Sequence, residues 1–202
     1  MRINNVLDEL FTRKSNISVI RALKNYNTGI SGRKISRIVR LTAKNTLSTL
    51  TYLEDLGLVN RIRGGREHLF TLNRSNYLVD KAILPLLKTE EEFALEISSK
   101  VKSALQRKVE AVIIFGSVAR KEETGMSDLD LCIVSDKSDG IEEIVNKLRQ
   151  QMHEIYNINI SPLYISKKDF LKKAKKNQPP LHDIVKEGIV VVGQSMRRIL
   201  NG

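Results

Sequence analysis

Residues 111–117 read Ala-Val-Ile-Ile-Phe-Gly-Ser, and residues 127–131, just downstream, read Ser-Asp-Leu-Asp-Leu. The apolar run 111–115 is typical of a buried strand that ends at a glycine. Residues 128–134 predict a second strand. Because strand side chains alternate between the two faces, Asp128 and Asp130 should share one face, while Leu129 and Leu131 should enter the opposite layer.

This pair of aspartates predicts a cation site. Two carboxylates about 6 Å apart repel by about 3 kcal/mol at an effective dielectric constant of about 20. A divalent cation between them would relieve that repulsion, and hard cations prefer carboxylate oxygens. Gly116 would let a ligand approach the backbone, and Ser117 would begin a helical turn whose free N–H groups suit phosphate. The two strand ends together predict a nucleotide site.

This constellation resembles the nucleotidyltransferase superfamily typified by DNA polymerase beta, and most closely its minimal members. The family pattern is Gly-Ser, then Ala-Arg-Gly-Glu, then Ser-Asp-hydrophobic-Asp-hydrophobic, and residues 116–122 and 127–131 follow it, with Lys121 in place of the second glycine. The resemblance implies a mixed sheet that binds a nucleoside triphosphate such as ATP and Mg²⁺, and transfers a nucleotidyl group. On it, Asp128 and Asp130 hold the metal and are catalytic, and Gly116, Ser117 and Arg120 bind the nucleotide.

Active members of that family carry a third carboxylate on a later strand. The matching strand here is expected around residues 158–165, where the equivalents are Asn159 or Ser161. Neither side chain can act as a base at neutral pH. Glu154 and Asp169 flank the strand and are the alternatives. Metal and nucleotide binding are therefore better supported than turnover.

Each of these residues also has a purely structural interpretation. The aspartates could cap turns or accept backbone hydrogen bonds at the start of a strand. Arg120 and Lys121 could be a solvated helix end. Ser117 could be a helix N-cap, which is compatible with a phosphate contact.

The chain has 202 residues and a formal net charge of +11, and that charge is segregated. Residues 1–88 contain 16 Lys and Arg against 6 Asp and Glu, which leaves 18 basic and 17 acidic residues for 89–202. Nearly all the surplus lies in the first part, as in a module that binds a polyanion. Improved solubility is the alternative explanation, but it requires no such segregation.

The cysteine and histidine content and the hydropathy argue against a protein with internal disulfides, a histidine metal site, a signal peptide or a membrane span. Cys132 is the single cysteine, so no disulfide can form within the chain, and the three histidines lack metal-ligand spacing. Residues 1–11 have no apolar segment of signal-peptide length, and the longest apolar runs are too short to cross a bilayer. We expect a soluble cytoplasmic protein.

The first part of the chain predicts three helices and a hairpin. A helix after Asn16 is followed by one capped by Ser31, with Ile35, Ile38 and Val39 inward. Thr42 should cap a third helix, which Gly57 ends as a left-handed cap. This helix should bury Leu47, Leu50, Leu53 and Leu56. Its other side should present Lys44, Asn45, Ser48, Thr49 and Tyr52. The alternating residues 58–63 and 66–72 predict two strands around Gly64-Gly65.

This order of elements predicts a winged helix-turn-helix, and residues 46–61 resemble the recognition helix and wing of ArsR/MarR-like regulators. The resemblance implies that the third helix enters the major groove of duplex DNA and that the wing lies near phosphates or the minor groove. A winged helix used for protein contact is the alternative. The expected DNA-binding residues are Lys44, Asn45, Ser48, Thr49, Arg61, Arg63 and Arg66.

The sequence thus predicts an α/β chain of two domains. A winged helix-turn-helix domain with a linker helix should occupy 1–88, and a nucleotidyltransferase fold with a mixed sheet should occupy 89–202. Residues 76–87 are apolar enough on one side to form a homodimer interface. A small helical partner protein is a further possibility, because some minimal nucleotidyltransferases have one. The main functional alternative to a DNA-binding nucleotidyltransferase is a transcriptional regulator whose second domain binds nucleotide or only scaffolds.

Overall fold

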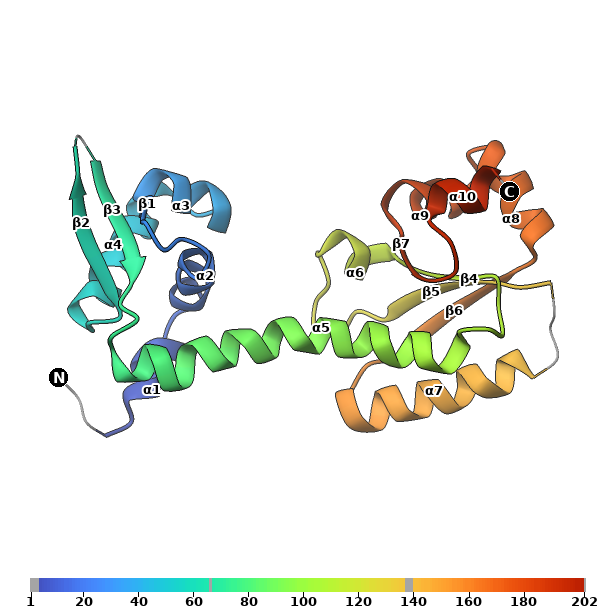
Figure 1. The fold of residues 1–202 in the computed structure, drawn as a ribbon, viewed down its shortest axis with the longest axis horizontal. Coiled ribbons are helices and arrows are strands. Elements are labelled where there is room, and N and C mark those ends of the chain that lie inside the picture. Colours follow the sequence, from blue (N-terminus) through green and yellow to red (C-terminus); the bar gives the residue numbers. More distant parts are fainter. Residues whose placement is uncertain (1–3, 66, 137–139, 202) are drawn as a thin grey trace. The chain divides into compact units, whose positions relative to one another are not determined.

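The computed structural model describes residues 4–65, 67–136 and 140–201, and the side chains of these except Val6 and Asn201. The chain divides into two compact units, one ending at Glu92 and the other beginning at Phe93. Among the described residues, none of the helices has the length and apolar character needed to span a bilayer. Figure 1 labels the elements of both units.

The N-terminal unit packs helices against a small antiparallel sheet in the order β1-β3-β2. Phe70 and Leu50 belong to its buried core, together with Leu87 from the helix that follows the unit's sheet. Figure 1 shows α2, α3 and α4 gathered beside this sheet. The elements are α1 (Val6–Phe11), α2 (Lys14–Leu23), β1 (Ile30–Ser31), α3 (Gly32–Val39), α4 (Ala43–Asp55), β2 (Val59–Gly64), β3 (Glu67–Leu72) and a π-helical turn (Val79–Ile83).

Both expected helix caps of this unit are present. The Ser31 hydroxyl accepts a hydrogen bond from the Lys34 N–H at 3.4 Å, and the Thr42 hydroxyl accepts one from the Asn45 N–H at 3.2 Å. Arg40 has φ 54°, so the chain turns sharply between α3 and α4. Gly57 has φ +72° and ends α4 as the sequence predicts. The local signals therefore set the ends of both helices.

The sequence prediction is wrong about the burial of two aliphatic side chains, Leu47 and Ile38. Leu47 is 51% exposed and Ile38 is 46% exposed, although both were expected inside. The buried residues of α4 are Thr46, Thr49, Leu50 and Leu53. They follow the spacing i, i+3, i+4, i+7 of a helix face. Leucines at every third position drift around the helix axis, because 3.6 residues complete one turn, so Leu47 cannot lie on the same side as Leu53.

The C-terminal unit is a four-stranded mixed sheet, in the order β6-β5-β4-β7, between two layers of helices. β4 pairs antiparallel with β5 and β7, and β5 pairs parallel with β6. The elements are α5 (Leu84–Leu105, from its second half), β4 (Ala111–Phe115), α6 (Gly116–Arg120), β5 (Leu129–Val134), α7 (Ile141–Tyr156), β6 (Ile160–Ile165), α8 (Lys167–Lys175), α9 (Leu181–Glu187), β7 (Ile189–Val192) and α10 (Met196–Asn201).

The two faces of this sheet bury different side chains. Leu129 and Leu131 join the layer made by α5 and α7, as the strand alternation predicts. Cys132 points into the other layer, with Phe170 of α8 and Ile184 of α9. Burial raises the pKa of the Cys132 thiol to about 12, so it acts as a packed apolar side chain. Figure 1 shows α5 and α7 on one side of the sheet and α8, α9 and α10 on the other.

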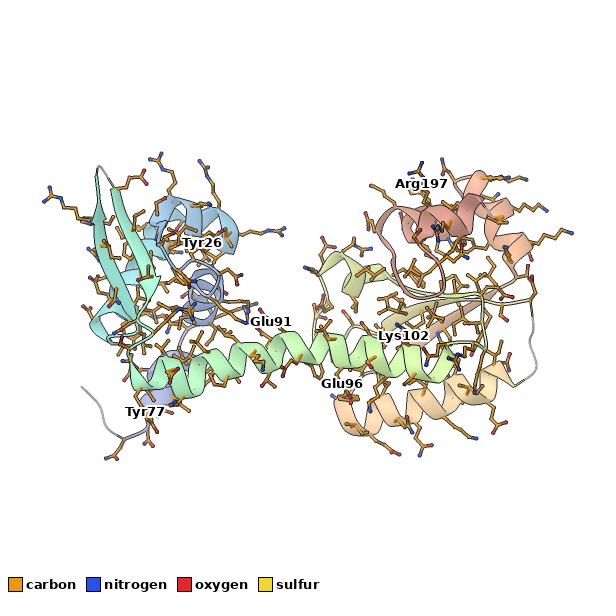
Figure 2. The ribbon with its side chains drawn as sticks, viewed as in Figure 1. Tyr26, Tyr77, Glu91, Glu96, Lys102 and Arg197 are labelled. Atoms are coloured by element: carbon orange, nitrogen blue, oxygen red, sulfur yellow. The ribbon has the colours of Figure 1, made fainter. Side chains whose placement is uncertain are left out.

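The side chains at the start of the C-terminal unit tie α5 to α7. The Tyr156 hydroxyl donates to Glu96 at 3.1 Å, and the Phe93 and Tyr156 rings lie edge to face with centroids 5.8 Å apart. Glu96 is labelled in Figure 2. These contacts fix the second half of α5 on α7 through side chains that are partly open to solvent.

The exposure pattern of α4 makes a stability prediction. Leu50→Ala should lower the free energy of unfolding by about 2–5 kcal/mol, because it leaves a cavity in a closed core. Leu47→Ala should change it by less than about 1 kcal/mol, because half of that side chain already faces water. Urea unfolding followed by circular dichroism measures both variants against the wild type. Equal losses for the two leucines would contradict this orientation of α4.

Candidate functional site

The end of β4 and the start of β5 meet at Gly116. Phe115 pairs with Asp130 in the antiparallel ladder, and Gly116 follows with φ +72°. A Cβ atom on Gly116 would lie 2.2 Å from Oδ2 of Asp130. Only glycine combines this backbone conformation with so close an approach. The carboxylate of Asp130 therefore lies directly against the backbone of the Gly116 corner.

Asp130 is half-buried, and its pKa is raised above the usual aspartate value. Desolvation is the largest cause, and the negative charge of Asp128 adds to it. A hydrogen bond with Ser161 and the charge of Arg120 oppose the rise in pKa. Asp128 is exposed just before β5, close enough to repel the Asp130 carboxylate. The two aspartates thus act on the same small region.

The donor set of this region fits a hard divalent cation. Two carboxylates supply oxygen ligands, and a cation between them would offset both the desolvation of Asp130 and its repulsion by Asp128. Within residues 4–65, 67–136 and 140–201, no group of three or more His, Cys, Asp or Glu side chains is arranged to hold a metal ion. Any cation here would therefore rely on two protein carboxylates together with oxygens from a ligand.

The neighbouring strand β6 places Ser161, and not a carboxylate, beside Asp130. Asp130 and Ser161 are direct partners in the parallel β5–β6 ladder, and the Ser161 hydroxyl opposes the rise in the pKa of Asp130. Asn159 precedes the strand, and its Oδ1 lies 3.1 Å from Nδ1 of His153. The strand itself, Ile160–Ile165, contains no carboxylate. A hydroxyl thus stands beside Asp130, at one of the two positions where the family resemblance implies a third carboxylate.

The two alternative carboxylates have partners elsewhere. Oε1 of Glu154 accepts a hydrogen bond from Gln150 at 2.8 Å along α7. Asp169 accepts one from the Ser166 hydroxyl at 3.0 Å, at the first turn of α8. Both side chains stabilise the helices that carry them. Neither is among the groups that influence the pKa of Asp130.

Arg120 already has anionic partners. Its Nε lies 2.9 Å from Oε2 of Glu122, and a terminal nitrogen lies 3.7 Å from Oε2 of Glu187. The hydrogen bond with Glu122 and the charges of Glu122, Glu187 and Asp183 raise the pKa of the guanidinium. A phosphate contact by Arg120 would therefore require it to exchange carboxylate partners for phosphate oxygens.

A closed turn positions the chain before the aspartates. The Thr124 N–H donates to the Ser127 hydroxyl at 3.0 Å, and the Ser127 N–H donates to the Thr124 carbonyl at 3.0 Å. Ser127 of the sequence motif thus has a structural role in this turn. Sequence reasoning missed Thr124, although a Thr-x-x-Ser pair that ends at a strand is a recognisable turn signal.

The second candidate surface lies on α4 of the N-terminal unit. Lys44, Asn45 and Ser48 are exposed, as expected. A groove of about 490 Å³ runs along this side of the helix. It is lined by Arg13, Lys44, Leu47, Ser48, Thr51, Tyr52 and Asp55. The sequence did not predict Arg13 as part of this surface. Its guanidinium lies 5.4 Å from the centroid of the Tyr52 ring. Arg13 and Tyr52 are far apart in the sequence, and only the packing of the helices brings them together.

Thr49 does not belong to this surface. It is 3% exposed, and its hydroxyl donates to the Ser15 hydroxyl at 3.1 Å. It lies on the inner side of α4 with Thr46 and Leu50. The expected direct contact of Thr49 with DNA is therefore corrected: this side chain joins α4 to α2 instead.

The three arginines expected on the wing differ in their surroundings. Arg61 is turned onto α4, 2.6 Å from Glu54 and 3.1 Å from the Thr51 hydroxyl, with its guanidinium 5.4 Å from the Phe70 ring centroid. This geometry is at odds with a free phosphate contact by Arg61. Arg63 is exposed on β2. Arg66 lies outside the described residues.

Comparisons with solved structures give only slight likenesses. A predicted DNA-binding transcriptional regulator from E. coli is 21% identical, covers 43% of this chain and 84% of its own, and has a TM-score of 0.36. A toxin-antitoxin with AMP-PNP is 15% identical over 52% and 81%, with a TM-score of 0.37. TrmBL2, an archaeal chromatin protein, is 16% identical over 93% and 73%, with a TM-score of 0.29.

The match to a family model is more specific. A search of curated proteins by sequence found no match. Residues 99–197, just under half of the chain, match the model of the family described as polymerase beta, nucleotidyltransferase. The matched range contains β4, β5 and β6 with the Gly116 corner, Asp128 and Asp130. The C-terminal unit therefore carries a nucleotidyltransferase domain of the polymerase beta family at residues 99–197.

Proposed function

We propose that this protein binds duplex DNA through its N-terminal unit and binds a nucleoside triphosphate with Mg²⁺ through its nucleotidyltransferase domain. The observation that carries the nucleotide site is the close approach of the Asp130 carboxylate to Gly116. It brings the residues proposed for phosphate and for the cation to one corner. Neither the Gly116-Ser117 corner nor the pair Asp128 and Asp130 would form such a site alone.

The roles of the residues follow from their chemistry. Gly116 and Ser117 hold the phosphates at the corner, and Asp128 and Asp130 supply oxygens to Mg²⁺. Mg²⁺ supplies charge neutralisation for the phosphate oxygens. Arg120 binds phosphate only after its bonds to neighbouring glutamates open. The residues proposed to face the nucleotide thus come from α6, from the position just before β5 and from the start of β5.

Binding of nucleotide without transfer is the outcome that the site favours. Transfer needs a group that removes the proton from the acceptor hydroxyl, and a carboxylate suits that task. Ser161 stands in register with Asp130 instead, and a serine hydroxyl remains protonated at neutral pH. A regulator of transcription that senses nucleotide is therefore our leading assignment, and the DNA-binding unit is its output.

The family match favours a second candidate, transfer of a nucleotidyl group to an unidentified acceptor. Incubation with labelled ATP, CTP, GTP or UTP, Mg²⁺ and cell lysate distinguishes the two. Label that appears on an acceptor with the wild type, and not with Asp128→Ala/Asp130→Ala, would establish transfer. Binding of nucleotide without any transferred label would establish the sensor.

The order of elements in the N-terminal unit supports our proposal of a winged helix-turn-helix. Helix α3, a sharp turn at Arg40 and helix α4 precede a hairpin, β2–β3, and α4 presents polar side chains to solvent. The charge surplus of residues 1–88 suits a polyanion. Lys44, Asn45, Ser48 and Arg63 remain in the proposed contact set, and Arg66 stays with them as a sequence-based proposal.

We also propose two protein partners, a second copy of this chain and a small helical protein. Tyr77, labelled in Figure 2, is 75% exposed, and Leu86 is 48% exposed. Exposed apolar side chains within residues 76–87 support a homodimer, whose mass light scattering measures directly. A small helical partner of the C-terminal unit would be recovered by co-purification from the native host.

The nucleotide site predicts a loss of binding on mutation. Asp130→Asn should weaken Mg²⁺-dependent ATP binding at least about tenfold, a free-energy change of about 1.4 kcal/mol, because it removes a charged cation ligand. The matched control is Glu143→Gln, which removes an exposed carboxylate paired with Lys147 on α7. Titration calorimetry with and without Mg²⁺ measures all three proteins. Unchanged affinity of the Asp130 variant for ATP with Mg²⁺ would refute the proposed nucleotide site.

The raised pKa of Asp130 predicts a pH dependence of stability. Without a divalent cation the folded chain holds this proton more tightly than the unfolded chain does. The contribution of Asp130 to the unfolding free energy should therefore fall as the pH rises from the ordinary value of 3.8 through the raised pKa. In urea unfolding over this range, the unfolding free energy of Asp130→Asn should change more favourably with rising pH than that of the wild type, and Mg²⁺ should reduce this difference. Parallel slopes for both proteins without Mg²⁺ would argue against the shift.

The wing predicts which arginine contacts DNA. Arg63→Ala should lower the slope of log affinity against log salt by about one unit, because one phosphate contact is lost. Arg61→Ala should leave that slope unchanged, because its guanidinium is bonded to Glu54. Fluorescence anisotropy with a labelled 20-base-pair duplex, about two helical turns long, measures the slopes. Lys108→Ala in the C-terminal unit is the control. A drop for Arg61→Ala equal to that for Arg63→Ala would refute this assignment.

A further inference from the structure

Leu47 is the large apolar side chain on the exposed side of α4. It is 51% exposed and lines the α4 groove between Lys44, Ser48 and Thr51. The inner side of the helix is already filled by Thr46, Thr49, Leu50 and Leu53. Leu47 therefore contributes little to the core, and its free half faces the groove.

A half-exposed leucine is common on protein surfaces and needs no special explanation by itself. Leu86 on α5 is 48% exposed, for example. Leu47 differs in its neighbours, because polar and basic side chains share its groove, while Asp55 adds a negative charge at the far end of α4. A leucine in the middle of such a surface can gain free energy only from an apolar group on whatever binds there.

The occupant of the groove should be negatively charged and large. Arg13 and Lys44 line it, and residues 1–88 carry 16 Lys and Arg against 6 Asp and Glu. The Arg13 guanidinium lies over the Tyr52 ring, whose hydroxyl donates to Glu9, so this cation is held among the residues that line the groove. Duplex DNA fits this charge pattern, with phosphates at the edge and base edges facing the helix.

The major groove of DNA presents one apolar group, the C5-methyl of thymine. On the basis of the DNA binding proposed above, we propose that Leu47 contacts a thymine methyl group and makes the protein selective for an A·T pair at that position. Lys44, Asn45 and Ser48 read or position neighbouring groups through hydrogen bonds. Leu47 is then a specificity residue, because its contact disappears when the methyl group is absent.

The test removes the methyl group alone. Sites are first enriched from a random duplex library with the full-length wild-type chain, and each thymine of the enriched site is then replaced by deoxyuridine. Binding is measured by fluorescence anisotropy for the wild type, Leu47→Ala and the control Leu95→Ala, which removes a 70% exposed leucine from the C-terminal unit. Circular dichroism confirms that each variant is folded.

At one thymine, deoxyuridine should weaken binding by the wild type and by Leu95→Ala about three- to fivefold, the equivalent of one methyl group removed from apolar contact. Leu47→Ala should bind both duplexes equally. Two results would overturn the role of Leu47 and leave DNA binding intact. The enriched duplexes could contain no preferred thymine, or deoxyuridine could weaken binding by Leu47→Ala as much as it weakens binding by the wild type. Absence of any duplex binding by the wild type would instead refute the proposed DNA-binding function, and this inference with it.

Discussion

The contact between the Asp130 carboxylate and the backbone of Gly116 is the constraint on which the candidate site depends. It requires β4 and β5 to pair with Phe115 opposite Asp130, and it requires a residue without a Cβ atom at the turn. The same pairing places Asp130 beside Ser161 on the third strand. One register therefore decides which groups surround the carboxylate, how strongly it is desolvated and whether a base stands next to it.

The charged side chains of the two units are arranged differently. In the C-terminal unit, like charges at Asp128 and Asp130 are held together at some cost, which a bound cation would offset. In the N-terminal unit, several basic side chains are left exposed, while Arg61 is neutralised by Glu54. Surplus charge alone does not identify a contact residue. The local partners of each side chain decide whether it can bind a further anion.

Much of the fold could be predicted from the sequence because the signals are local. The apolar run that ends at Gly116, the caps at Ser31 and Thr42, and the alternation of Leu129 and Leu131 each depend on a few neighbouring residues. The predicted orientation is wrong where leucines recur every three residues and not every 3.6, as for Leu47. The burial of Thr49 against Ser15, the pairing of Arg61 with Glu54 and the register of Ser161 all depend on contacts between distant segments. No sequence window contains them.

Helix α5 has a consequence for any attempt to study the two units apart. It is continuous from Leu84 to Leu105, with Leu87 in one core and Ile97, Val101 and Leu105 in the other. A cut between Glu92 and Phe93 would leave the last carbonyls of one fragment and the first N–H groups of the other without helical partners. It would also leave Glu90 and Glu91, which pair with Arg21 of α2 and with Lys24 just after it, at the frayed end of the first fragment. Isolated fragments should therefore overlap along this helix, so that each keeps whole turns beyond its last packed leucine or isoleucine.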